Sequence, residues 1–142
     1  MKTILTCLAL VAVPFNDAVI ARCTTPQPPC EALAGSTIVA LVDVIEAAPP
    51  WEITRRNESR PVPQAVKLRI METFKAVSSR EREISIRISH ESAESIFLDG
   101  GKRYLLYARQ GKDGTHSTSC TRTKLADIAR AELSRLRQCI RK

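Results

Sequence analysis

The chain has 142 residues and a formal net charge of +7, with 22 Lys and Arg against 15 Asp and Glu. A basic surface of this kind favours contacts with acidic surfaces, anionic lipids or polyanions, or is simply well solvated. Only 4% of the residues are aromatic, which argues against a surface that stacks the bases of nucleic acids. We therefore expect no nucleic-acid partner.

Residues 1–21 have the pattern of a secretory signal peptide. Lys2 precedes the apolar run ILTCLALVAVPF, and Val19 and Ala21 stand three and one positions before a candidate cleavage site. Cleavage after Ala21 would leave a single domain, residues 22–142, with a modest core. We expect this domain to be secreted or periplasmic.

Two other interpretations of the N-terminus fit the residues less well. The apolar run is shorter than the ~20 residues of a membrane-spanning helix, and no later segment is apolar enough to span a bilayer. A lipoprotein signal would need a small residue before the modified cysteine, but Arg22 precedes Cys23 and Cys7 comes too early. The sequence therefore predicts no membrane span.

Four cysteines follow the predicted signal peptide, and in an oxidising compartment four cysteines predict two disulfides. A metal site is not expected, because Cys23 and Cys30 are too far apart for a zinc knuckle and the chain has only His90 and His116. Both histidines lack acidic or cysteine neighbours and are interpreted as surface strand residues. The four cysteines are Cys23, Cys30, Cys120 and Cys139.

The middle of the chain has the composition of five β-strands. The first segment is apolar on both faces, which is typical of a strand buried on both sides, whereas the second and third alternate apolar and polar residues. Glycine-containing turns flank the fourth segment. The five segments are residues 36–48, 64–74, 82–89, 102–109 and 115–119.

Helical patterns flank these strands. Residues 31–34, followed by Gly35, are expected to form one helical turn before the first strand. From Thr123, a candidate N-cap, apolar residues recur at helical spacing and predict a C-terminal helix that docks one face on the sheet. Five strands without crossover helices predict an antiparallel sheet closed into a small barrel. The expected fold is therefore mainly β with a terminal helix.

The predicted C-terminal helix limits the disulfide pairing. About fifteen helical residues place their ends ~22 Å apart, and the short link after Cys120 cannot return far enough to bring the cysteines within the ~7 Å that a disulfide needs. Cys120 therefore cannot pair with Cys139. Cys23 and Cys30 each take one C-terminal partner, which leaves two connectivities open.

Three parts of the chain together resemble the netrin-like module of tissue inhibitors of metalloproteinases. They are FLDGGKRYLLYARQGKDGTHSTSCTRT, the N-terminal C…PPCEALAGSTIVALVDVIE, and a terminal helix ending in Cys139. The resemblance implies a five-stranded OB-type barrel with a docked C-terminal helix and N-terminal cysteines bridged to the C-terminal region. It also implies the pairing: Cys23 with Cys120, and Cys30 with Cys139.

In those inhibitors the mature chain begins with a cysteine whose amine and carbonyl oxygen chelate the zinc of the protease. Here that first cysteine is missing, as is its partner, which would fall near Glu94 and Ser95. Arg22 would be the first residue after cleavage, and only its removal would expose Cys23 and Thr24, which resemble the opening pair of the family. Inhibition of a zinc metalloprotease through these residues is therefore the alternative function.

The leading interpretation is a secreted, disulfide-bonded binding module that recognises a protein or another extracellular ligand. Residues 47–64 are long for a loop between two strands, and the loop after the first strand of an OB fold is a common binding element. Trp51, Arg55 and Arg56 are the expected partner contacts, although Trp51 could instead pack on the barrel. No nucleophile-base pattern or phosphate loop occurs, so we expect neither enzymatic activity nor a cofactor.

Overall fold

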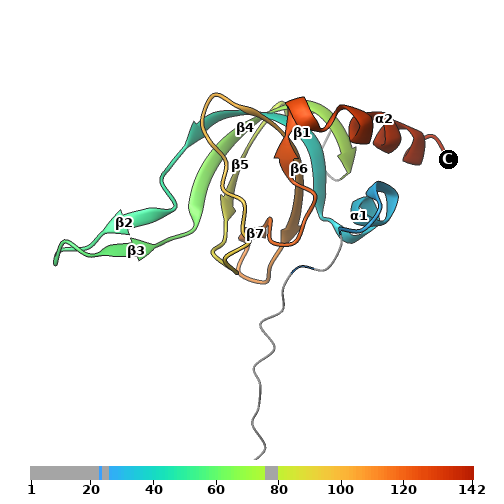
Figure 1. Ribbon diagram of the computed structural model, residues 1–142. Coiled ribbons are helices and arrows are strands. Elements are labelled where there is room, and N and C mark those ends of the chain that lie inside the picture. Colours follow the sequence, from blue (N-terminus) through green and yellow to red (C-terminus); the bar gives the residue numbers. More distant parts are fainter. Residues whose placement is uncertain (1–22, 24–25, 76–79) are drawn as a thin grey trace, which may run out of the picture.

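The computed structural model describes residues 23, 26–75 and 80–142 (Figure 1). The predicted signal peptide, Arg22 and Thr24 lie outside the described residues. The elements are α1 (Pro29–Gly35), β1 (Ile38–Ala47), β2 (Trp51–Ile53), β3 (Ser59–Pro61), β4 (Gln64–Lys75), β5 (Glu83–Ile88), β6 (Arg103–Gln110), β7 (His116–Ser117), β8 (Lys124–Leu125), the 3-10 helix η1 (Ala126–Ile128) and α2 (Arg130–Cys139). None of the described helices is long and apolar enough to cross a membrane.

Five strands close into the predicted OB-type barrel. The strand order is β1-β4-β5-β7-β6, and pairing of β6 with β1 closes the ring. Four of the neighbouring pairs are antiparallel, but β5 and β7 are parallel, with Ile88 opposite His116. The expectation of a fully antiparallel sheet is therefore wrong at this pair. An odd number of strands cannot close with every neighbour antiparallel, so one parallel pair is required.

The strand alternation places one apolar cluster inside the barrel and another outside it. From β4 and β5, Val66, Leu68, Ile86 and Ile88 point inward, as the alternating pattern predicted. The second cluster lies between the outer face of β1 and β6 and the two helices. It contains Val39, Leu105, Tyr107, Leu133 and Leu136. β1 contributes to both clusters, which confirms the expectation that it is buried on both sides.

The two terminal helices differ in how well the sequence predicted them. The short N-terminal helix is confirmed as α1, whereas α2 begins at Arg130 and not after Thr123. Thr123 is buried, and its hydroxyl accepts a hydrogen bond from Tyr107 N (2.9 Å) and donates one to Tyr107 O (2.7 Å). This pairing with β6 holds the segment extended, and Lys124–Leu125 continues it as β8. The attachment to the barrel therefore outweighs the local helical pattern.

Both predicted disulfides are present. Cys23 pairs with Cys120 and Cys30 pairs with Cys139, with Cα–Cα distances of 5.2 and 5.6 Å. They join the chain before β1 to the segment after β7 and to the end of α2. We call this part of the chain, residues 23 and 26–35 with α1 included, the N-terminal arm. Two disulfides are typical of proteins outside the reducing cytosol.

We predict that replacing both Cys30 and Cys139 by Ser lowers the free energy of unfolding by about 4 kcal/mol, because a loop of this length strongly constrains the unfolded chain. The sequence separation that the bond closes is 109 residues. Denaturant unfolding under non-reducing conditions measures the difference. A loss of less than about 1 kcal/mol would show that this crosslink does not limit the unfolded ensemble as the chain-entropy model assumes.

Candidate functional site

The long loop after β1 forms a hairpin, β2–β3, that projects from the barrel on the side away from α1 and α2 (Figure 1). Trp51 is 54% exposed and Ile53 is 62% exposed. Because they are two positions apart in a strand, their side chains point to the same face of the hairpin. Glu52, between them, points to the opposite face and pairs with Arg60 of β3. The hairpin therefore has one apolar face and one charged face.

The hairpin ends in a hydrogen-bonded turn that carries two cations. Thr54 N donates to Glu58 O and Asn57 N donates to Thr54 O, both at 2.9 Å. Asn57 has φ 60°, in the left-handed region that Asn tolerates better than most residues. Arg55 and Arg56 lie exposed in this turn, directly after the exposed strand β2.

The structure therefore brings together the three residues that the sequence singled out in this loop. Trp51, Arg55 and Arg56 all lie on the hairpin. Trp51 is half exposed in β2, so the alternative in which it packs as part of the barrel is not observed. The sequence missed the two strands themselves, because each has only three residues and lies among prolines that argue against a regular strand.

Contacts at its base fix the hairpin to the barrel. Val62 N donates a hydrogen bond to Pro50 O at 3.0 Å, which joins the two ends of the hairpin. His90 comes after the barrel strand β5, and its Nε2 lies 2.5 Å from the same oxygen. The ring of His90 packs on Phe97, with the centroids 4.4 Å apart. His90 is exposed as expected, but it follows β5 and is not itself in a strand. Its contact with the hairpin has no local sequence signal, because the partners are 40 residues apart.

The first residue of β4 adds a buried polar anchor beside the hairpin. Gln64 is almost fully buried. Its side-chain amide donates to Ala48 O (3.1 Å) and Leu98 O (2.8 Å), and its oxygen accepts from Leu98 N (2.9 Å). Since a buried amide is costly unless its groups are paired, these bonds fix where the chain leaves the barrel and where it returns.

The Cys23–Cys120 disulfide lies at a second place that the sequence singled out. Oε2 of Glu94 is 3.2 Å from Cys23 Sγ and 3.9 Å from Cys120 Sγ. These atoms form a group that could hold a metal ion by position alone, but the two sulfurs are bonded to each other. Cysteine binds a metal ion as a thiolate, so the oxidised protein offers only the Glu94 carboxylate in this group.

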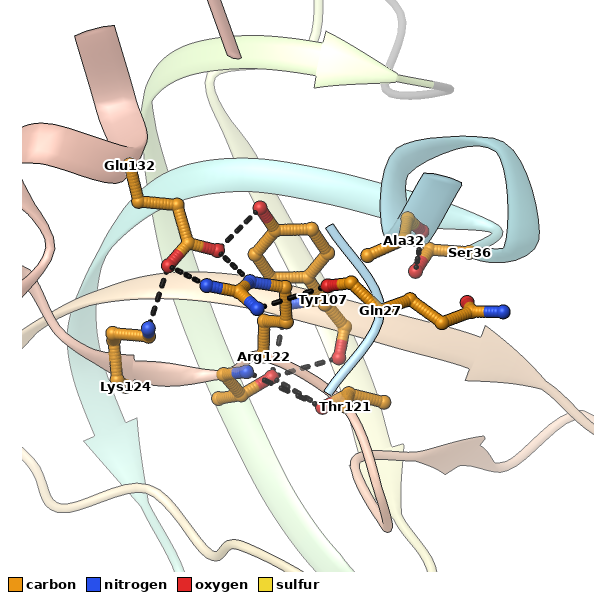
Figure 2. Close-up of polar contacts among 9 residues, drawn as sticks. Gln27, Ala32, Ser36, Tyr107, Thr121, Arg122, Lys124 and Glu132 are labelled. Atoms are coloured by element: carbon orange, nitrogen blue, oxygen red, sulfur yellow. Dashed lines mark hydrogen bonds and ion pairs between the residues drawn. The ribbon is translucent and has the colours of Figure 1, made fainter. Parts of the chain in front are cut away.

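A buried carboxylate connects the N-terminal arm, β6 and α2 (Figure 2). Glu132 of α2 is 6% exposed and accepts hydrogen bonds from Arg122 Nε (2.5 Å) and Lys124 Nζ (2.5 Å). Tyr107 OH of β6 donates to the same carboxylate at 2.8 Å. Arg122 also donates from Nη1 to Gln27 O in the N-terminal arm, at 2.9 Å. We call these four side chains the Glu132 cluster.

The sequence contains a signal for the Glu132 cluster. Glu132 lies three residues after Ala129 and four before Leu136, on the apolar side of the predicted helix. An acidic residue there must be buried with a partner. The cations that pair with Glu132 are Arg122 and Lys124. Their identity depends on the fold and could not be predicted from the spacing of residues along the helix.

Charge and burial act on the pKa values of the Glu132 cluster in opposite directions. Burial raises the pKa of Glu132, but the hydrogen bonds from Arg122, Lys124 and Tyr107 outweigh it and leave this pKa below its ordinary value. Burial, together with the hydrogen bond to Glu132, raises the pKa of Tyr107 well above its ordinary value. The cluster therefore holds an ionised carboxylate and a neutral phenol at neutral pH.

One further residue differs from its sequence-based interpretation. His116 is buried rather than on the surface, because the closing strand β7 inserts between β5 and β6. On the opposite side of the barrel from this strand the structure also shows a partly exposed ion pair, in which the Arg137 guanidinium of α2 donates two hydrogen bonds to Glu72 of β4, at 2.7 and 2.8 Å.

No protein-family model matches the chain, and no curated protein matches it. The resemblance to the netrin-like module therefore remains a prediction from the sequence.

We predict that Glu132→Gln lowers the free energy of unfolding by about 3 kcal/mol at neutral pH, because it leaves Arg122 and Lys124 partly buried without a counter-charge. The pKa of Glu132 is depressed in the folded protein, so its contribution is present above the unfolded pKa and is lost as pH falls through the folded pKa. The difference between wild type and variant should therefore shrink in acid.

Glu72→Gln is the matched control, since Glu72 also pairs with an arginine but its side chain is 32% exposed. A surface pair of this kind contributes less than about 1 kcal/mol. Denaturant unfolding of both variants at neutral and acidic pH checks the prediction. Equal losses for the two variants, or a Glu132→Gln loss that does not change with pH, would contradict it.

Proposed function

We propose that this protein is a disulfide-bonded binding module, acting outside the cytoplasm, that recognises a protein partner through the β2–β3 hairpin. The observation that carries the proposal is the pair of exposed apolar side chains, Trp51 and Ile53, on one face of a projecting hairpin. Exposed aromatic residues of this kind are enriched at the centres of protein interfaces. We propose a binding protein and not an enzyme.

The construction of the hairpin supports this proposal. A two-stranded hairpin is marginally stable alone, but this one is anchored to the barrel by the contact of His90 with Pro50 O and by the hydrogen bonds of Gln64. The anchoring reduces the conformational entropy that binding would otherwise cost. With Arg55 and Arg56 in the turn, the partner we propose has an apolar depression with acidic residues at its rim.

The test is the capture of partners from an extracytoplasmic fraction by immobilised wild-type protein and variants. Trp51→Ala should weaken binding of a captured protein at least about tenfold, as expected for a hot-spot aromatic. Ile140→Ala is the control, because Ile140 is similarly exposed (51%) but follows α2. Equal binding by Trp51→Ala and wild type would refute the assignment of the hairpin as the recognition element.

Metalloprotease inhibition is the second candidate function, and one observation favours it. The disulfide to Cys120 holds Cys23 against the barrel, so a chain that began at Cys23 would present a tethered amine and carbonyl oxygen. Such preorganisation is what a chelating group needs. A chain that began at Arg22 would place one untethered residue ahead of this position.

We predict that a form starting at Cys23 inhibits a zinc metalloprotease and that a form starting at Arg22 inhibits it weakly or not at all. Acetylating the amine of the Cys23 form should abolish inhibition, because chelation needs a neutral, free amine. Protease assays on the three forms, with folding checked by circular dichroism, provide the measurement. Potent inhibition by the Arg22 form would contradict the tethering argument, and inactivity of both free-amine forms would eliminate this candidate.

A further inference from the structure

A hollow of about 410 Å³ lies over β4 and β5, next to the base of the hairpin. Ala65 and Lys67 of β4 and Ser85 and Arg87 of β5 contribute to its lining. These residues alternate with Val66 and Ile86, which point into the barrel, so their side chains lie on the outer face of the sheet. The hollow is therefore built on paired barrel strands and not on a loop.

The pairing of these strands explains both the shape and the charge of the hollow. Ala65 is opposite Arg87, and Lys67 is opposite Ser85. The small side chains of Ala65 and Ser85 leave space on the outer face of the sheet. The long cationic side chains of Lys67 and Arg87 flank this space. Glu46 is the only acidic residue in the lining, so cations outnumber anions there. Lys67 lies 3.5 Å from Glu83. Arg87, in contrast, acts on Asp113 by charge alone, which adds to the hydrogen bonds from Thr115 that lower the pKa of Asp113. Arg87 is therefore the stronger candidate for a ligand contact.

A buried imidazole also lines the hollow. His116 of β7 is only 7% exposed, and its Nδ1 is buried without a hydrogen-bond partner among the described residues. Buried polar side-chain atoms in native proteins are nearly always paired, so this nitrogen needs a hydrogen-bonding group that the described residues do not supply. Burial lowers the pKa of His116, so the ring is neutral at neutral pH and carries one N–H donor.

We propose that this hollow binds a carboxylate group carried on a short apolar body. The Arg87 guanidinium suits a carboxylate because its N–H groups can bond both oxygens. Lys67 adds a second positive charge, and His116 adds a polar group that lacks a partner in the protein. The apolar body would lie against Ala48 and Ala65, which also line the hollow. A volume of this size is typical of small-molecule sites. The site is independent of the proposed hairpin function.

Two sources could supply this chemistry: a free organic acid, or the C-terminal carboxylate of a peptide. The experiment titrates isotope-labelled protein with sodium butyrate and follows the backbone amides of Ala65, Ser85 and Gly114, all of which line the hollow. Butyramide has the same shape without the charge, and sodium chloride controls for ionic strength. Saturable shifts of these amides with butyrate alone are the expected result.

Arg87→Gln should weaken butyrate binding about tenfold, the change expected on loss of one charge-assisted hydrogen bond. Arg141→Gln is the matched control, because Arg141 is an exposed cation that does not line the hollow. The proposal fails if butyramide binds as well as butyrate, if no saturable shifts occur, or if Arg141→Gln weakens binding as much as Arg87→Gln.

A peptide that ends in a free carboxylate, compared with its C-terminally amidated form, distinguishes the two sources. Tighter binding of the free-acid peptide than of butyrate would support the site and identify a chain terminus as its ligand. Binding of butyrate but not of the peptide would support the site and identify a free acid. The amide spectrum of the Arg87→Gln variant without ligand shows whether the barrel is intact.

Discussion

The attachment of α2 and of the N-terminal arm to the barrel depends on one buried carboxylate. Glu132 accepts hydrogen bonds from Arg122, Lys124 and Tyr107, and Arg122 extends the network to the backbone of Gln27. The carboxylate belongs to α2, the phenol to β6, and the cations to the segment between β7 and α2. A single charge therefore joins the helix, the barrel wall and the N-terminal arm (Figure 2).

The two disulfides act on the same parts of the chain as the Glu132 cluster. Each disulfide connects the N-terminal arm to one side of the Glu132 cluster, at Cys120 before it and at Cys139 after it. The covalent bonds restrict the unfolded chain, whereas the cluster specifies how the arm and α2 lie on the barrel. A buried ion group of this kind contributes little net free energy when complete, but breaking it is costly. The hairpin has no part in this network, which leaves it available for recognition.

Features that rest on local periodicity could be predicted from the sequence. The alternation of apolar and polar residues in β4 and β5 predicted which side chains point into the barrel. The apolar pattern on both faces of β1 indicated that this strand is buried on both sides. The disulfide pairing followed from the resemblance to the netrin-like module, after the helix had excluded one of three connectivities. The parallel pair could also have been inferred, because five strands cannot close with strictly alternating directions.

Features that depend on tertiary contacts could not be predicted in the same way. The local pattern predicts too early a start for α2, because Thr123 bonds to the backbone of Tyr107 rather than capping a helix. The sequence predicts a surface position for His116, because nothing near it shows that β7 closes the barrel. Trp51, Arg55 and Arg56 were predicted as a group, but the hairpin that carries them depends on anchors such as His90 that are distant in the sequence.

Native-state hydrogen exchange tests the central claim, that the Glu132 cluster makes the barrel and α2 one cooperative unit and leaves the hairpin outside it. The amides of Leu133 in α2 and Tyr107 in β6 should exchange with the same opening free energy, that of global unfolding. The amide of Thr54, which bonds only within the hairpin turn, should exchange with a clearly lower one. An opening free energy for the Leu133 amide well below that for the Tyr107 amide would contradict the account. So would an opening free energy for the Thr54 amide as high as that of the barrel amides.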